Sequence, residues 1–293
     1  MYQRILAPLD GSPLAEQVLP YVVKLGLSNG TPVTLLRAYS IPSVGLEDTS
    51  GMYLEQIIAA YMAEAQAYLK RVGDVLGQAG LAISSVVREG EAASLLVGEA
   101  ETVPGTLIAM STHGRSGISR WVMGSVTDKV LHAAACPMLI IRSSRVEEPA
   151  DEQDDERGKR WTGPVFIRNI TAPLDGSDLA EKILPHAISA AKGFDVPVTP
   201  VRVVTDPAKH AEATEYLERA SANLREQGVT CPGGTLLRGE PAEALLSMLQ
   251  AQPETLVTMT TRGHSGIQRW VLGSVTDRIA RYSGTPVLVV QGE

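Results

Sequence analysis

Short apolar runs alternate along this chain with longer segments in which apolar residues recur about every 3.6 positions. The apolar runs are typical of buried strands, and the longer segments are typical of amphipathic helices. In the first half the predicted strands span residues 4–10, 31–39, 81–90, 105–111 and 136–142. Predicted helices begin after Ser12 and span 52–80, 91–101 and 125–135. Strands that alternate with helices predict a parallel sheet covered by helices on both faces.

The second half of the chain repeats the first. The stretch "ILAPLDGSPLAEQVLP" at 5–20 matches "ITAPLDGSDLAEKILP" at 170–185, and "STHGRSGISRWVMGSVTDKV" at 111–130 matches "TTRGHSGIQRWVLGSVTDRI" at 260–279. The two shifts are 165 and 149 positions, so the second copy lacks 165 − 149 = 16 residues, lost between Ala38 and Gly90. This period is far longer than a solenoid repeat, and it indicates a tandem duplication of a whole domain.

The predicted domains span residues 1–143 and 164–293. The segment between them, 144–163, is acidic, poor in apolar residues and contains Pro and Gly. Such a composition is typical of a flexible linker.

Composition narrows the functional classes. The net charge of −7 argues against a general nucleic-acid binder, whose affinity comes from neutralising phosphates. Cys136 and Cys231 form no disulfide framework or zinc spacing. The apolar runs are too short to span a bilayer, which argues against a membrane partner, and "MYQRILAPLDG" does not resemble a signal peptide. We therefore expect a cytoplasmic protein.

The predicted topology places a ligand site in each copy. A Rossmann-like five-stranded parallel sheet of order 3-2-1-4-5 binds ligands beyond the carboxyl ends of strands one and four, where the strand order reverses. In the first copy strand one ends at Asp10, and strand four ends at Met110 and continues into the repeated stretch. Two distinctive features that lie far apart in the chain are therefore expected to meet at one crevice.

The repeated stretch has the chemistry of a phosphate loop. Glycines at 114, 117, 263 and 266 allow close approach of backbone amides to an anion. Ser125 opens a predicted helix, whose N-terminal amides and dipole favour negative charge. Each loop carries one arginine and one histidine, which have exchanged places between the copies: His113 and Arg115 against Arg262 and His264. Asp10 and Asp175 are acceptors for a ribose hydroxyl or a phosphate-bound metal.

Purely structural roles account for several of the same residues. Ser125 with Asp128, and Ser274 with Asp277, have the S-x-x-D spacing of a capping box. Gly117 and Gly266 suit a tight turn, and Asp10 suits a turn within "LDGS". These alternatives stay open from the sequence.

The spacing G-x9-G-S, from Gly114 to Gly124-Ser125 and from Gly263 to Gly273-Ser274, resembles the nucleotide loop of the universal stress protein family. The "APLDGS" start and the final strands "CPMLIIR" and "TPVLVVQ" resemble that family too, and the resemblance covers both copies. The chain differs from the family's ATP-binding class at the first glycine of the loop, where Ser111 and Thr260 stand.

The resemblance implies two adenine nucleotide alpha hydrolase-like domains that bind ATP, ADP or AMP, with or without Mg²⁺. The residues implied to line the sites come from matching positions of the two copies. In the first copy they are Asp10, Ala38, Met110, Ser111, Gly114, Arg115, Gly117, Gly124, Ser125 and Val126. In the second they are Asp175, Val203, Met259, Thr260, Arg262, Gly263, Gly266, Gly273, Ser274 and Val275.

Three functions fit these features. The first is a stress-response sensor or regulator with two adenine-nucleotide sites. The second is a module of the same fold that binds a protein partner and no nucleotide. The third is a slow ATPase, which the sequence supports least, because it has no Walker A motif, no G-x-S-x-G elbow and no H-E-x-x-H.

The last strand of each copy predicts how the copies meet. "PMLII" at 137–141 and "PVLVV" at 286–290 are apolar throughout, and each is expected at a sheet edge. An uncovered apolar edge is a liability. We therefore expect the strands to pair antiparallel in an intramolecular pseudo-dimer, as stress proteins of this family commonly dimerise. Two unpaired domains on an acidic tether are the alternative, and a homodimer of the whole chain is possible.

Overall fold

The structure of the protein is a computed structural model that describes residues 1–40, 51–112, 123–142, 154–261 and 272–291. The first copy holds β1 (Arg4–Pro8), α1 (Pro13–Glu16), α2 (Leu19–Asn29), β2 (Val33–Tyr39), α3 (Gly51–Gln78), β3 (Ile83–Glu89), α4 (Ala92–Glu101), β4 (Thr106–Ser111), α5 (Ser125–Ala133) and β5 (Met138–Ile141). The expected helix after Ser12 is two helices, α1 and α2, and Pro20 stands in the first turn of the second.

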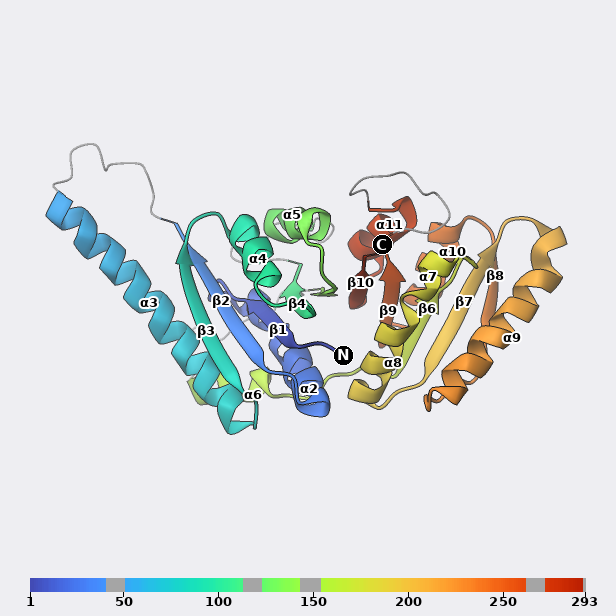
Figure 1. Ribbon diagram of the computed structural model, residues 1–293, viewed down its shortest axis with the longest axis horizontal. Coiled ribbons are helices and arrows are strands. Elements are labelled where there is room, and N and C mark those ends of the chain that lie inside the picture. Colours follow the sequence, from blue (N-terminus) through green and yellow to red (C-terminus); the bar gives the residue numbers. More distant parts are fainter. Residues whose placement is uncertain (41–50, 113–122, 143–153, 262–271, 292–293) are drawn as a thin grey trace.

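The second copy repeats this order after an added helix, α6 (Asp154–Trp161). It consists of β6 (Asn169–Pro173), α7 (Asp178–Glu181), α8 (Leu184–Phe194), β7 (Val198–Val204), the 3-10 turn η1 (Pro207–Lys209), α9 (His210–Glu226), β8 (Thr235–Arg238), α10 (Pro241–Gln250), β9 (Thr255–Thr260), α11 (Ser274–Tyr282) and β10 (Val287–Val290). Part of the length difference between the copies lies in α3, which has 28 residues where α9 has 17. Figure 1 shows α3 running past the ends of β2 and β3.

The ten strands within the described ranges join one sheet of order β3-β2-β1-β4-β5-β10-β9-β6-β7-β8. Each copy therefore has the predicted order 3-2-1-4-5, and its own strands are parallel. One core lies between the sheet and α2, α3, α8 and α9, and the other lies between the sheet and α4, α5, α10 and α11. The layers agree with the prediction of helices on both faces (Figure 1).

The two copies meet at the middle of the sheet. β5 pairs antiparallel with β10, with Leu139 opposite Leu288, and the exposed fractions of these leucines are 1% and 3%. The predicted edge-to-edge pairing is therefore confirmed. Both cores contain residues of both copies, so the seam lies inside a continuous interior.

Contacts on each face of the sheet reinforce the seam. On one face Ser28 Oγ donates to the Gly193 carbonyl at 2.8 Å, and the rings of Tyr21 and Phe194 meet edge to face. On the other face Arg281 of α11 forms ion pairs with Asp277 and with Asp128 of α5. Asp128 therefore bonds across the seam and does not close a capping box on its own helix.

The interpretation of 144–163 as a flexible linker is wrong for its second part. Residues 154–161 form α6, and Trp161 at its end is 6% exposed. Residues 143–153 lie outside the described ranges. None of the helices within the described ranges combines the length and apolar character that crossing a bilayer requires.

A histidine between the copies predicts a pH effect on stability. The Tyr2 hydroxyl lies 2.8 Å from His186 Nδ1, and burial lowers the pKa of His186 from 6.5 to about 4. An unfolded chain binds a proton at this residue below pH 6.5, whereas the folded chain does so only near pH 4. The free energy of unfolding should therefore fall as pH drops through this window, by roughly 1–2 kcal/mol after solvent screening.

Urea denaturation at pH 7.5 and pH 4.5 measures this effect. His186→Gln keeps an acceptor for Tyr2 and should reduce the pH dependence relative to the wild type. An identical pH dependence in both proteins would contradict the assignment to His186.

Candidate functional site

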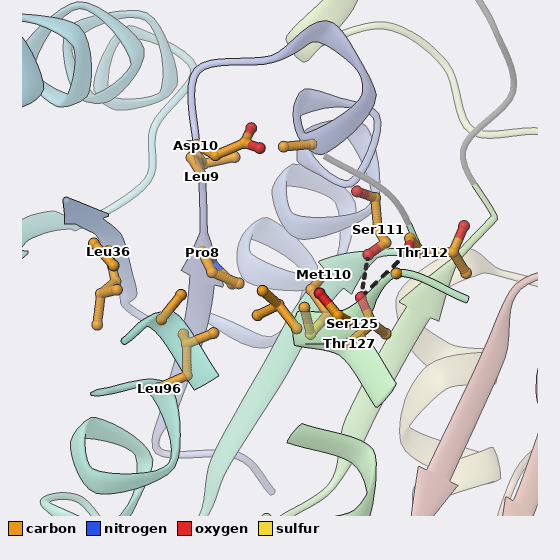
Figure 2. A pocket seen from close by; sticks show the side chains of 15 residues that line it. Pro8, Leu9, Asp10, Leu36, Leu96, Met110, Ser111, Thr112, Ser125 and Thr127 are labelled. Atoms are coloured by element: carbon orange, nitrogen blue, oxygen red, sulfur yellow. Dashed lines mark hydrogen bonds between the residues drawn. The ribbon is translucent and has the colours of Figure 1, made fainter. Parts of the chain in front are cut away.

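A cavity of about 260 Å³ opens where the strand order of the first copy reverses (Figure 2). β1 lies between β2 and β4, so the carboxyl ends of β1 and β4 are neighbours there. The lining comes from the ends of β1, β2 and β4 and the starts of α4 and α5. It comprises Pro8, Leu9, Asp10, Ala15, Leu36, Ala38, Ala92, Leu96, Met110, Ser111, Thr112, Gly124, Ser125, Val126 and Thr127.

One part of the cavity wall is apolar. Leu36, Leu96 and Met110 are buried, and Ala38 and Val126 pack beside them. Such a wall suits the flat face of an aromatic ring, because little polar surface has to lose its water on binding.

Asp10 stands at the other side of the cavity (Figure 2). Its Oδ1 accepts from the Ser12 backbone N–H at 2.9 Å and from Ser12 Oγ at 2.6 Å. Ser12 Oγ in turn accepts from the Ala15 N–H, which caps α1 as predicted. Gly11 has φ of 86°, which a residue with a side chain rarely adopts. The turn role of Asp10 is thus present, and it fixes the carboxylate at the cavity.

The first turn of α5 also faces the cavity. Gly124 is the N-cap, and no side chain caps this helix, so the capping-box hypothesis for Ser125 and Asp128 is wrong. Hydrogen bonds to Ser111 and Thr112, at the end of β4, hold this turn instead. The Gly124 N–H donates to the Thr112 carbonyl at 2.7 Å, and Thr127 Oγ1 donates to the Ser111 carbonyl at 2.9 Å. The positive end of the helix dipole is therefore directed at the cavity.

The cap of α4 positions a further part of the wall. Glu91 accepts from the Ser94 N–H, and this bond, together with those from Ser94 Oγ and Lys129, lowers the pKa of Glu91 to about 2. Glu240 caps α10 in the same way through the Glu243 N–H. The cap fixes where α4 begins, and Ala92 in its first turn lines the cavity.

The second copy repeats this hydrogen bonding. Asp175 Oδ1 accepts from Ser177 at 3.0 and 2.6 Å. Thr276 Oγ1 donates to the Thr260 carbonyl. Gly273 is the N-cap residue of α11, which begins at Ser274, and no side chain makes a capping hydrogen bond there. The remaining predicted residues described here are Val203, Met259 and Val275, of which Met259 is buried and the two valines are partly buried.

Six predicted site residues lie outside the described ranges, namely Gly114, Arg115, Gly117, Arg262, Gly263 and Gly266. Conversely, sequence reasoning missed several residues that line the cavity. Thr127 could have been found, because "SVTD" recurs around Thr276. Ala92 and Leu96 of α4 had no such signal, since only the folding of α4 over β2 and β4 brings them there.

No group of three or more His, Cys, Asp or Glu within the described ranges could hold a metal ion. Asp10 is the one acidic residue among the described lining residues.

The model of the universal stress protein family matches residues 1–142 and 167–291 of the chain. A universal stress protein of Mycolicibacterium smegmatis is 22% identical over 98% of this chain and 96% of its own length. One of Methanocaldococcus jannaschii is 31% identical over 44% of this chain and 85% of its own length. Among solved structures, a universal stress protein of Archaeoglobus fulgidus has a similar fold, with a TM-score of 0.73, 20% identity and complete coverage of both chains.

Proposed function

The chain belongs to the universal stress protein family, and on that premise we propose that it binds an adenine nucleotide in each copy and acts as a stress-response sensor or regulator. The first site is the cavity between the ends of β1 and β4, and the second is the matching place between β6 and β9. ATP is the proposed ligand.

The observation that carries the proposal is the pairing of an apolar wall with an uncapped helix start in one cavity. The wall formed by Leu36, Ala38 and Leu96 suits adenine. The first turn of α5 suits a phosphate, because its amides and dipole favour an anion. Asp10 lies at the cavity and suits a ribose hydroxyl. It is a single carboxylate, so a Mg²⁺ ion in this site would depend mainly on phosphate oxygens for its ligands.

Calorimetric titration with ATP, ADP, AMP and cyclic AMP tests the proposal and counts the sites. We expect two sites, with ATP bound more tightly than adenosine because of the helix N-terminus. Absence of binding for all four nucleotides, together with a nucleotide-free protein by mass spectrometry, would favour the partner-binding module. Release of phosphate with added Mg²⁺ would point to the slow ATPase.

Filling the first cavity should remove one of the two sites. Ala38 at the end of β2 lines the cavity, and its counterpart in the second copy is Val203. Ala38→Leu adds three carbons in the space assigned to adenine, so the titration should give one site per chain in place of two. We expect the affinity of the filled site to fall about 5- to 150-fold, since overpacking typically costs about 1–3 kcal/mol.

Ala82→Leu is the matched control, because Ala82 is exposed at the start of β3 and does not line the cavity. Two sites of unchanged affinity in Ala38→Leu would place the nucleotide elsewhere.

A further inference from the structure

The helix between the copies, α6, packs against α2 and α3 of the first copy. Gly158 is buried there, and a side chain at this position would meet Val75 of α3 at about 3.5 Å. Trp161 belongs to the core between the sheet and these helices. α6 is therefore an integral part of the first copy, although it lies outside the repeated sequence.

A buried carboxylate is the centre of this contact. Glu16 is 4% exposed and accepts four hydrogen bonds from α6 and α3. Arg157 donates to both carboxylate oxygens at 2.8 Å, Trp161 Nε1 donates at 3.0 Å, and the Tyr68 hydroxyl donates at 2.8 Å. A buried carboxylate needs such partners, so α6 and Glu16 depend on each other.

The contact reaches the nucleotide site through a short segment. Glu16 is the last residue of α1, the single turn that follows the Asp10 turn. Arg157 also donates to the Gly11 carbonyl at 3.3 Å, next to Asp10. One guanidinium therefore holds both ends of the segment Gly11–Glu16, and Ser12 within it holds the Asp10 carboxylate.

The second copy has the same segment without α6. Arg202 stacks on Tyr216 as Arg37 stacks on Tyr68, each guanidinium carbon 4.9 Å from the ring centre. The Tyr68 hydroxyl donates to Glu16 at 2.8 Å, whereas the buried hydroxyl of Tyr216 interacts with the matching Glu181 carboxylate without forming a hydrogen bond of ordinary geometry. Counting from the paired tyrosines, Asn223 stands where α3 has Val75, so α9 lacks the apolar contact that α6 uses.

We propose that Arg157 is a positioning residue for the first nucleotide site, and that α6 makes the two sites unequal. By holding Gly11–Glu16, α6 fixes the Asp10 turn before the ligand arrives, which reduces the ordering cost of binding. Linkage requires the reverse as well, so nucleotide in the first site strengthens the docking of α6. The expected change in nucleotide affinity rests on the proposed function. The ordering of Gly11–Glu16 by α6 exists without nucleotide.

Amide hydrogen exchange of the full chain without nucleotide tests the structural effect. In Arg157→Gln we expect exchange of the amides in 12–16 to accelerate about tenfold or more, while the matching amides in 177–181 keep the wild-type rate. Lys159→Ala is the control, because Lys159 is exposed on the same helix and forms an ion pair with Glu156 of that helix. Unchanged exchange at 12–16, or equal acceleration in both segments, would overturn the inference.

Photolabelling with 8-azido-ATP, followed by peptide mapping, measures each site separately. Arg157→Gln should weaken labelling of first-copy peptides about tenfold and leave second-copy peptides unchanged. Arg157→Lys keeps the positive charge but loses the bidentate hydrogen bonding to Glu16. Its first-copy labelling should lie between that of the wild type and that of Arg157→Gln, and this variant replaces Arg157→Gln if the latter fails to fold. An equal loss at both sites, or no loss, would overturn the inference. Failure of the wild type to label at either site would overturn the proposed function and leave the exchange result to decide the role of Arg157.

Discussion

Replacing Leu139 by lysine is expected to lower the free energy of unfolding by at least about 4 kcal/mol. Leu139 lies opposite Leu288 in the antiparallel pair of β5 and β10, and both side chains point into the core shared by the two copies. The variant loses the burial of one leucine and brings an ammonium group into an apolar cluster of buried side chains. Urea denaturation followed by circular dichroism measures the change.

Two further observations identify the seam as the cause. Ser85→Lys is the matched control, because Ser85 is an exposed residue on the outer edge strand β3, and its effect should stay within about 0.5 kcal/mol. Small-angle scattering at low urea should show a larger radius for Leu139→Lys, because separated copies remain joined by the chain. A variant with wild-type stability and radius would show that the seam contributes little.

The fold was largely predictable because its signals are local and occur twice. Most strands of the first copy are apolar runs between turn residues, β3 being the more polar exception, and the second copy repeats the pattern. The pairing of β5 with β10 followed from one physical requirement, since two apolar edge strands without charge need a cover. The ends of β1 and β4 were placed together by the topology alone.

The errors lie where a residue's partner is distant in the sequence. Asp128 has the spacing of a capping residue, but Arg281 stands across the seam 153 positions away and binds it. The segment before Trp161 is charged and has the composition of a linker. Its Arg157 and Trp161 fall on one helical face, and only the folded first copy offers them Glu16 and Tyr68. Local composition contains no information about such partners.

Truncating Trp161 to alanine should detach α6 while leaving most of the fold intact. Trp161 is 6% exposed and donates to Glu16, and loss of a buried tryptophan typically costs about 3–5 kcal/mol. In this protein the loss in the free energy of unfolding cannot exceed the free energy with which α6 docks on the first copy, because α6 can detach without unfolding the sheet. The melting temperature should therefore fall only slightly, whereas local opening of α6 should become much more frequent.

Trypsin measures this opening, because α6 contains Arg157, Lys159 and Arg160. When closing is faster than cleavage, the rate of cutting follows the population of the open form. A loss of about 3 kcal/mol in docking should thus accelerate cleavage within α6 roughly a hundredfold. Trp161→Phe keeps most of the apolar area and loses one hydrogen bond to Glu16, about 1 kcal/mol, so its acceleration should be near fivefold. If trypsin cleaved Trp161→Ala at the wild-type rate, the population of detached α6 would not depend on Trp161. The contact of Trp161 with Glu16 would then not be what holds α6 on the first copy.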